Sequence, residues 1–113
     1  EAELDETGGA AAIADAWLAE AERLFPTAAV REQRLFHAPT LAGSLLQNGD
    51  VAEARAVLAA AIERAPEIRD RELAEEWRAR LVEAARWLAG DRDVDLGAVR
   101  ADRRLAPLWP HLR

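Results

Sequence analysis

The stretch from Leu45 to Glu67, LLQNGDVAEARAVLAAAIERAPE, contains the start, the body and the end of one predicted helix. Asn48-Gly49 is typical of a helix C-cap, and Asp50, followed three residues later by a glutamate, resembles a capping box. Apolar residues then recur at the helical period until Pro66, which cannot continue a helix. The stretch therefore predicts two antiparallel helices joined by a tight turn.

Turn signals and apolar spacing predict further helices along the chain. Residues 1–9 are acidic and end in glycine, so we expect a flexible lead-in before a single helical domain over residues 10–113. Pro39 interrupts the apolar pattern that follows the first helix. We expect a shorter helix to open there, because proline is tolerated in a first turn. The predicted helices cover about residues 10–25, 28–48 with a break near 39, 51–65, 70–89 and 96–101.

Two tryptophans lie on the apolar stripes of their predicted helices. Trp17 shares a helical face with Ile13, Leu24 and Phe25, and Trp77 lies on the stripe of the helix over residues 70–89. A stripe of large apolar residues at helical spacing normally packs against a neighbouring element. We therefore expect both Trp17 and Trp77 in the hydrophobic core.

The composition favours an all-α fold. Alanine, the strongest helix former, leads the apolar residues, and runs of β-branched residues typical of strands are missing. The 113 residues are enough for one domain. Every basic residue is Arg, which indicates a GC-rich bacterial source, and the lack of any Met suggests a piece of a longer protein.

Several classes of function are disfavoured by the residues present. A net charge of -6 works against nucleic-acid binding, which depends on a basic surface. The chain has no Cys, its histidines His37 and His111 are far apart, and its single serine, Ser44, lacks a nucleophile motif. We therefore predict no catalytic residue, no cofactor and no metal. No apolar run is long enough to span a membrane, so we expect a cytoplasmic location.

The acidic stretch from Asp91 to Asp102, DRDVDLGAVRAD, superficially resembles a calcium-binding loop. Leu96 stands where such a loop needs glycine, and the last ligand would be an aspartate rather than a glutamate. We interpret the stretch as a solvated acidic cap before the last helix.

The chain contains an internal repeat. Gly9 to Pro26 aligns with Gly49 to Pro66 without gaps, and the glycine, a leucine and the proline agree in register as well as several alanines. The turn signal returns once more at Gly90-Asp91. A signal that recurs at nearly constant spacing is typical of a helical array.

The central repeat resembles a tetratricopeptide repeat. The positions that match are Ala38, Leu41, Ala42, Leu45, Gly49, Asp50, Ala54, Leu58, Ala61 and Pro66. The resemblance implies antiparallel helix pairs stacked as a short right-handed solenoid, with the segment LGAVRADRRLAPLWPHLR as a C-terminal capping helix. The spacing near forty residues exceeds the usual repeat of that family, and an unrelated antiparallel bundle stays the alternative.

The same resemblance implies a peptide-binding groove lined by the first helix of each pair, with Phe36, Gly43, Leu46 and Gln47 facing it. Phe36 and Gln47 are candidates for apolar contact and hydrogen bonding, unless they are ordinary packing and solvated surface. The lysines with which chaperone-binding members of the family clamp a carboxylate are missing.

Two further candidate residues come from the helix over residues 70–89. Trp87 lies beside Arg80 on its more polar side, where it either binds a partner or packs against Leu105, Leu108 or Trp109 of the tail. The predicted partner-binding residues are therefore Phe36, Gln47, Arg80 and Trp87.

These patterns favour a protein–protein interaction module that binds a peptide or partner protein in a helical groove. The alternatives are a homodimerisation or assembly domain, or an accessory helical domain of a larger bacterial enzyme or regulator.

Overall fold

The computed structural model describes the backbone of residues 2–112 and the side chains of residues 9–112. The described chain is all helical and contains no strand, which confirms the predicted all-α class. The elements are α1 (Ala2–Leu24), α2 (Ala28–Gln47), α3 (Val51–Arg64), the 3-10 helix η1 (Ala65–Glu67), α4 (Arg71–Leu88), α5 (Leu96–Ala101) and the 3-10 helix η2 (Arg103–His111).

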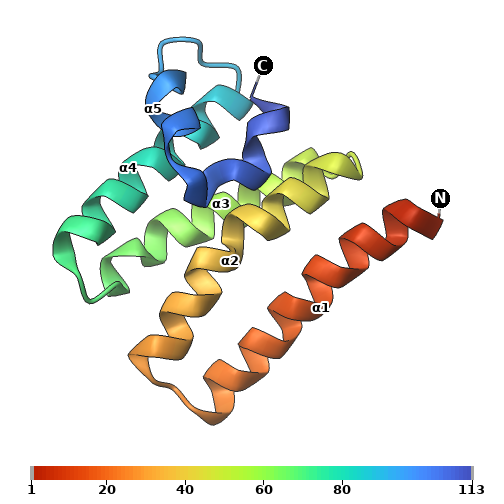
Figure 1. Ribbon diagram of the computed structural model, residues 1–113, viewed down its shortest axis with the longest axis vertical. Coiled ribbons are helices and arrows are strands. Elements are labelled where there is room, and N and C mark those ends of the chain that lie inside the picture. The colour runs from red at the N-terminus through yellow and green to blue at the C-terminus, as the bar shows by residue number, and fades with distance from the viewer. Residues whose placement is uncertain (1, 113) are drawn as a thin grey trace.

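Successive long helices pack side by side in alternating directions (Figure 1). Helix α2 lies between α1 and α3, and α4 packs on the other side of α3. After α4 the chain turns back through α5, and η2 packs against both α2 and α4. The molecule is flat, measuring 40 × 40 × 21 Å, and α1 forms one edge of it.

Helix ends follow local capping chemistry. The side chain of Thr27 accepts a hydrogen bond from the backbone N–H of Val30, and Asp70 accepts one from Leu73. Gly49 and Gly90 have φ angles of 86° and 100°, a left-handed conformation that favours glycine at a helix C-terminus. The predicted capping box at Asp50 is wrong, because its side chain makes no capping hydrogen bond.

The first helix differs from its expected start. Residues 1–9 were expected to form a flexible lead-in, whereas α1 already begins at Ala2 and runs through Gly8-Gly9. Glycine in a helix costs about 1 kcal/mol relative to alanine but introduces no steric block. A pair of glycines therefore need not end a helix.

Pro39 also departs from expectation. No new helix opens there, because α2 continues from Ala28 to Gln47 with Pro39 inside it. Proline lacks the N–H that would bond to the carbonyl of Leu35, and its ring crowds that carbonyl, so a bend is expected. Figure 1 shows the axis of α2 changing direction near its middle. Pro39 itself is fully buried, so tertiary packing offsets the local cost.

The core lies between α2, α3, α4 and the C-terminal segment. Trp77 of α4 is 0% exposed, which confirms its predicted core position, and its ring meets Phe36 edge-on at 5.3 Å between centroids. Its indole N–H is buried without a hydrogen-bond partner among residues 9–112. Other large side chains buried around it are Leu35, Leu58, Leu81, Val99, Leu105, Leu108 and Leu112.

The C-terminal segment closes this core. Leu105, Leu108 and Leu112 are completely buried. The segment passes so close to α2 that a Cβ atom added at Gly43 would lie 2.5 Å from the carbonyl oxygen of Pro107. Glycine at this position therefore lets the segment pack directly on the helix backbone.

Asp102 fixes the start of η2. Its carboxylate accepts hydrogen bonds from the backbone N–H and the guanidinium of Arg104, with Nη2 of the arginine 2.7 Å from Oδ2. The Arg104 guanidinium also reaches Glu76 of α4 at 3.0 Å. Asp102 thus connects the C-terminal segment to α4 through one arginine.

The close approach at Gly43 predicts that Gly43→Ala lowers the free energy of unfolding by about 1–3 kcal/mol, because the backbone of Pro107 must move. Gly9→Ala is the matched control. Gly9 also lies in a helix but has no atom near its Cβ position, so alanine there should stabilise by up to about 1 kcal/mol. Urea denaturation followed by circular dichroism measures both; stabilisation by Gly43→Ala would contradict the packing described.

The Asp102–Arg104 contact predicts a pH dependence. The hydrogen bond from Arg104 holds the pKa of Asp102 below its ordinary value, so the folded chain binds this proton less readily than the unfolded chain. Ionised Asp102 therefore adds to the free energy of unfolding above the ordinary carboxyl pKa. This stabilisation is lost as the pH falls through the lowered pKa of the folded chain. Asp102→Asn retains a capping oxygen but not the charge. Between about pH 5 and pH 2 its unfolding free energy should fall less steeply than that of the wild type. Parallel slopes in urea titrations would exclude this contribution.

Candidate functional site

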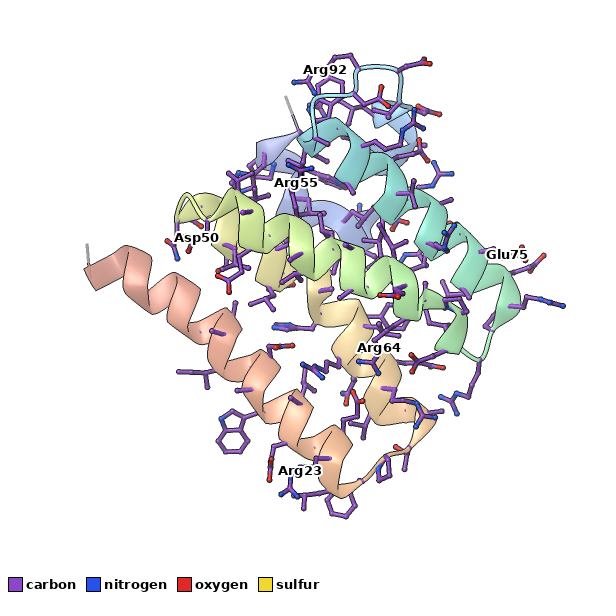
Figure 2. All side chains as sticks on the ribbon, turned by 180° about the vertical axis from the view of Figure 1, so that it is seen from behind. Arg23, Asp50, Arg55, Arg64, Glu75 and Arg92 are labelled. Carbon is purple, nitrogen blue, oxygen red and sulfur yellow. The ribbon has the colours of Figure 1, made fainter. Side chains whose placement is uncertain are left out.

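The face of α1 that meets the rest of the molecule carries charged side chains. Nε of Arg34 lies 3.3 Å from Oδ1 of Asp15, and Nη2 of Arg64 lies 3.1 Å from Oε2 of Glu22. Arg34 also approaches Glu22, with 3.7 Å between Nη1 and Oε1. Figure 2 shows Arg64 at the end of α3, beside the ribbon of α2. One carboxylate of α1 is therefore held by arginines from two other helices.

The remainder of this inner face is small or half-buried. Ala11 is buried, and its carbonyl oxygen lies 3.1 Å from Nε2 of His37 on α2. Leu18 is half-buried. These residues lie on the same stripe as Asp15 and Glu22, since they are spaced three or four positions apart. The inner face of α1 is thus a narrow stripe of two acids, one alanine and one leucine.

The large apolar side chains of α1 point the other way. Trp17 is 75% exposed, and Phe25, Ile13 and Leu24 are 64%, 60% and 54% exposed. The predicted core position of Trp17 is therefore wrong. Among the described elements, the backbone of α1 approaches only that of α2. The inner face meets α2, so the opposite face, which carries Trp17, is left uncovered. We call Ile13, Trp17, Ala21, Leu24 and Phe25 the α1 outer face.

The α1 outer face is hollowed near its centre. A shallow depression of about 520 Å³ is lined by Ala16, Trp17, Glu20, Ala21, Leu24 and Phe25. Its lining combines the small side chains of Ala16 and Ala21 with the aromatic rings of Trp17 and Phe25. This arrangement offers space for one large apolar side chain from another molecule.

One ion pair borders the depression. Nε of Arg23 donates to Oε2 of Glu20 at 3.0 Å, and this hydrogen bond lowers the pKa of the Glu20 carboxyl. Glu20 therefore stays ionised at neutral pH. Figure 2 shows Arg23 on α1 close to the turn into α2. The outer face is thus apolar with one charged pair at its rim, an anatomy typical of protein interfaces.

The four residues predicted to bind a partner lie elsewhere, and the structure does not join them into one site. Phe36 is half-buried against Trp77, and Gln47 is exposed at the last position of α2. Among residues 9–112, none of the four, Phe36, Gln47, Arg80 and Trp87, forms a hydrogen bond, ion pair or ring contact with another of them.

Arg80 and Trp87 on α4 each have a partner within the chain. Nη1 of Arg80 lies 2.9 Å from Oε1 of Glu83. The guanidinium carbon of Arg92 lies 3.9 Å from the centroid of the Trp87 ring, and Arg92 also donates to the Trp87 carbonyl oxygen at 2.8 Å. Trp87 is half-buried, and the guanidinium of Arg92, from the loop after α4, makes a cation–π contact with its ring.

The expected groove beside Gly43 is occupied by the chain itself. Pro107 of η2 lies against this glycine, so the C-terminal segment covers the part of α2 where a peptide was expected. A separate cleft of about 150 Å³ lies between α1, α2 and α3. Its charged groups, Asp15, Arg34 and Arg64, are already held in the ion pairs described above.

Neither a metal site nor a membrane-spanning helix is present among the described residues. The described part of the chain contains no group of three or more His, Asp or Glu side chains placed to hold a metal ion. None of its helices combines the length and apolar character that crossing a bilayer requires. Asp91, the first residue of the calcium-like stretch, instead pairs with Arg86 at 2.8 Å.

Comparison with known proteins returns no match among family models, curated proteins or solved structures.

Sequence reasoning missed the α1 outer face, although a signal was present. Asp15 and Glu22 lie seven residues apart on one stripe of the helix, and Arg34 and Arg64 follow on two later helices. The stripe with Asp15 and Glu22 can be predicted as the buried one only if Arg34 and Arg64 are known to face it. The apolar stripe alone suggests the opposite orientation.

The two orientations of tryptophan lead to a direct prediction. Trp77→Ala removes a fully buried side chain and should cost about 3–5 kcal/mol of unfolding free energy. Trp17→Ala removes a side chain that is 75% exposed and should change it by less than about 1 kcal/mol. Urea denaturation at low protein concentration measures both variants. Equal losses would mean that Trp17 is also part of the core.

Proposed function

We propose that this chain is a protein–protein interaction module and that the α1 outer face is its binding surface. The observation that carries the proposal is the exposure of Trp17, Phe25, Ile13 and Leu24 on one helix. Contiguous exposed apolar surface of this kind marks interaction sites in soluble proteins. Tryptophan is also among the residues that contribute most to interface free energy.

The arrangement of neighbouring helices supports this placement. In the internal repeat, residues of α1 align with residues of α3. Helix α3 has a helix on each side, α2 and α4, whereas α1 has only α2 among the described elements. The side of α1 without a helix is the side that carries the large apolar residues. A partner element packed there would give α1 the surroundings that α3 already has.

We further propose that the helices form a tetratricopeptide-like array. Support comes from the matched positions of the central repeat and from the successive antiparallel packing of α1 to α4. In that family a partner enters the groove lined by first helices. Here η2 packs on α2 at that place, so we assign binding to the α1 outer face instead.

A non-enzymatic function fits the same observations. The side chains of Arg80 and Trp87 are engaged within the chain, and the charged groups of the α1–α2–α3 cleft neutralise one another. The α1 outer face offers apolar contact and one ion pair, which suits binding rather than bond-making chemistry.

Site-specific photo-crosslinking tests the proposal. A photoreactive phenylalanine analogue replaces Trp17 in one variant and the exposed Arg55 of α3 in a matched control. After irradiation in an extract of the source cells, we expect discrete protein adducts from position 17 and none of the same mass from position 55. Mass spectrometry distinguishes adducts with a second copy from adducts with another protein. The absence of any adduct specific to position 17 would contradict the proposed surface.

A further inference from the structure

The α1 outer face has the spacing used by helices that pack along their length. Ile13, Trp17, Glu20 and Leu24 are separated by four, three and four residues. This alternation places one residue per turn on a continuous seam, as in paired helices. The seam is complete on α1 and is covered by no other element of the described chain.

We propose that this seam binds a second copy of the same chain, with the two α1 helices antiparallel. The inference rests on the proposed function and names the partner of that same surface. The two copies are related by a two-fold axis that crosses the seam midway between Trp17 and Glu20. Both copies then contribute the same patch, as in any two-fold interface.

The two-fold arrangement matches large side chains with small ones. Trp17 of one copy comes to lie over Glu20 and Ala21 of the second copy, within the depression that the alanines leave open. Ile13 comes beside Leu24 and Phe25 of the second copy. The symmetry repeats each contact, so both depressions are filled and the four large side chains of each copy leave water.

Polar groups on the seam also pair under this symmetry. The indole N–H of Trp17 has no acceptor among residues 9–112, and the ionised Glu20 of the second copy lies at the same level of the seam. Arg23 already donates to both oxygens of this carboxylate, and each oxygen keeps a second lone pair that can accept the indole N–H.

Charge selects the antiparallel direction. Parallel helices would place the ionised Glu20 of one copy opposite the ionised Glu20 of the other, which is unfavourable, whereas the antiparallel arrangement places each Glu20 opposite Trp17. Antiparallel packing also opposes the two helix dipoles.

The exposed area sets the expected strength. From their exposed fractions, the four large side chains present roughly 500 Å² per copy, hence about 1,000 Å² in a dimer. This lies just below the range of stable interfaces, which start near 1,200 Å². Each copy also carries a net charge of -6, which repels the other. We therefore expect a reversible dimer with a dissociation constant of roughly 1–100 μM that strengthens as salt screens the repulsion.

Sedimentation velocity from about 1 μM to about 1 mM protein tests self-association across that range. The wild type should change from monomer to dimer. Trp17→Arg should stay monomeric with unchanged helix content, because this side chain makes little contact within the monomer. Val51→Arg is the matched control: it also replaces an exposed apolar residue by arginine, on α3, and should dimerise like the wild type. A wild type that stays monomeric, or a dimer that survives Trp17→Arg, would overturn the proposal.

Disulfide trapping tests the relative direction of the two α1 helices. The natural sequence has no cysteine, so only the introduced cysteines can form a disulfide. Ile13→Cys and Leu24→Cys are prepared as separate proteins and mixed under mild oxidation. Antiparallel packing predicts that the mixed 13–24 disulfide dominates over the 13–13 and 24–24 products. Dominance of the two symmetric products would indicate parallel helices and refute the arrangement.

The failure of this inference and that of the proposed function give different results. If the chain is monomeric at every concentration and position 17 crosslinks to another protein, self-association is rejected and the α1 outer face remains the proposed binding surface. If the chain is monomeric and no adduct is specific to position 17, both self-association and the proposed binding surface are rejected.

Discussion

The position of Glu22 between Arg34 and Arg64 determines how α1 meets the rest of the molecule. Its carboxylate lies 3.1 Å from the arginine of α3 and 3.7 Å from the arginine of α2. The Glu22 side chain is only 22% exposed, and the two arginines offset the cost of taking its charge partly out of water. Rotating α1 to bury Trp17 would separate these groups. The exposed apolar face is therefore a consequence of a charged inner face.

The remainder of the fold does not need α1 for its core. Trp77 and the surrounding leucines are buried by α2, α3, α4 and the C-terminal segment. The segment after α5 contributes completely buried residues and fits against the backbone of α2 at Gly43. Helix α1 therefore packs on α2 along one side and exposes its apolar outer face on the other.

Local sequence signals predicted local structure well. The turn at Asn48-Gly49 and the core position of Trp77 follow from glycine conformation and from a strongly amphipathic helix. The continuous α2 was not predictable in the same way, because burial of Pro39 depends on elements distant in the sequence. The predicted core position of Trp17 is wrong for the same reason. Its apolar stripe is visible in the sequence, but the charges that turn the stripe outward belong to Arg34 and Arg64.

The most direct test of the account is the solvent exposure of Trp17 in the monomer. Fluorine NMR of 5-fluorotryptophan-labelled protein at low micromolar concentration, assigned with single Trp→Phe variants, reports each indole separately. We predict a large H₂O/D₂O isotope shift and strong broadening by a soluble paramagnetic agent for Trp17, and neither effect for Trp77. Equal protection of the two indoles in the dilute monomer would mean that α1 buries its apolar face, and would contradict the account.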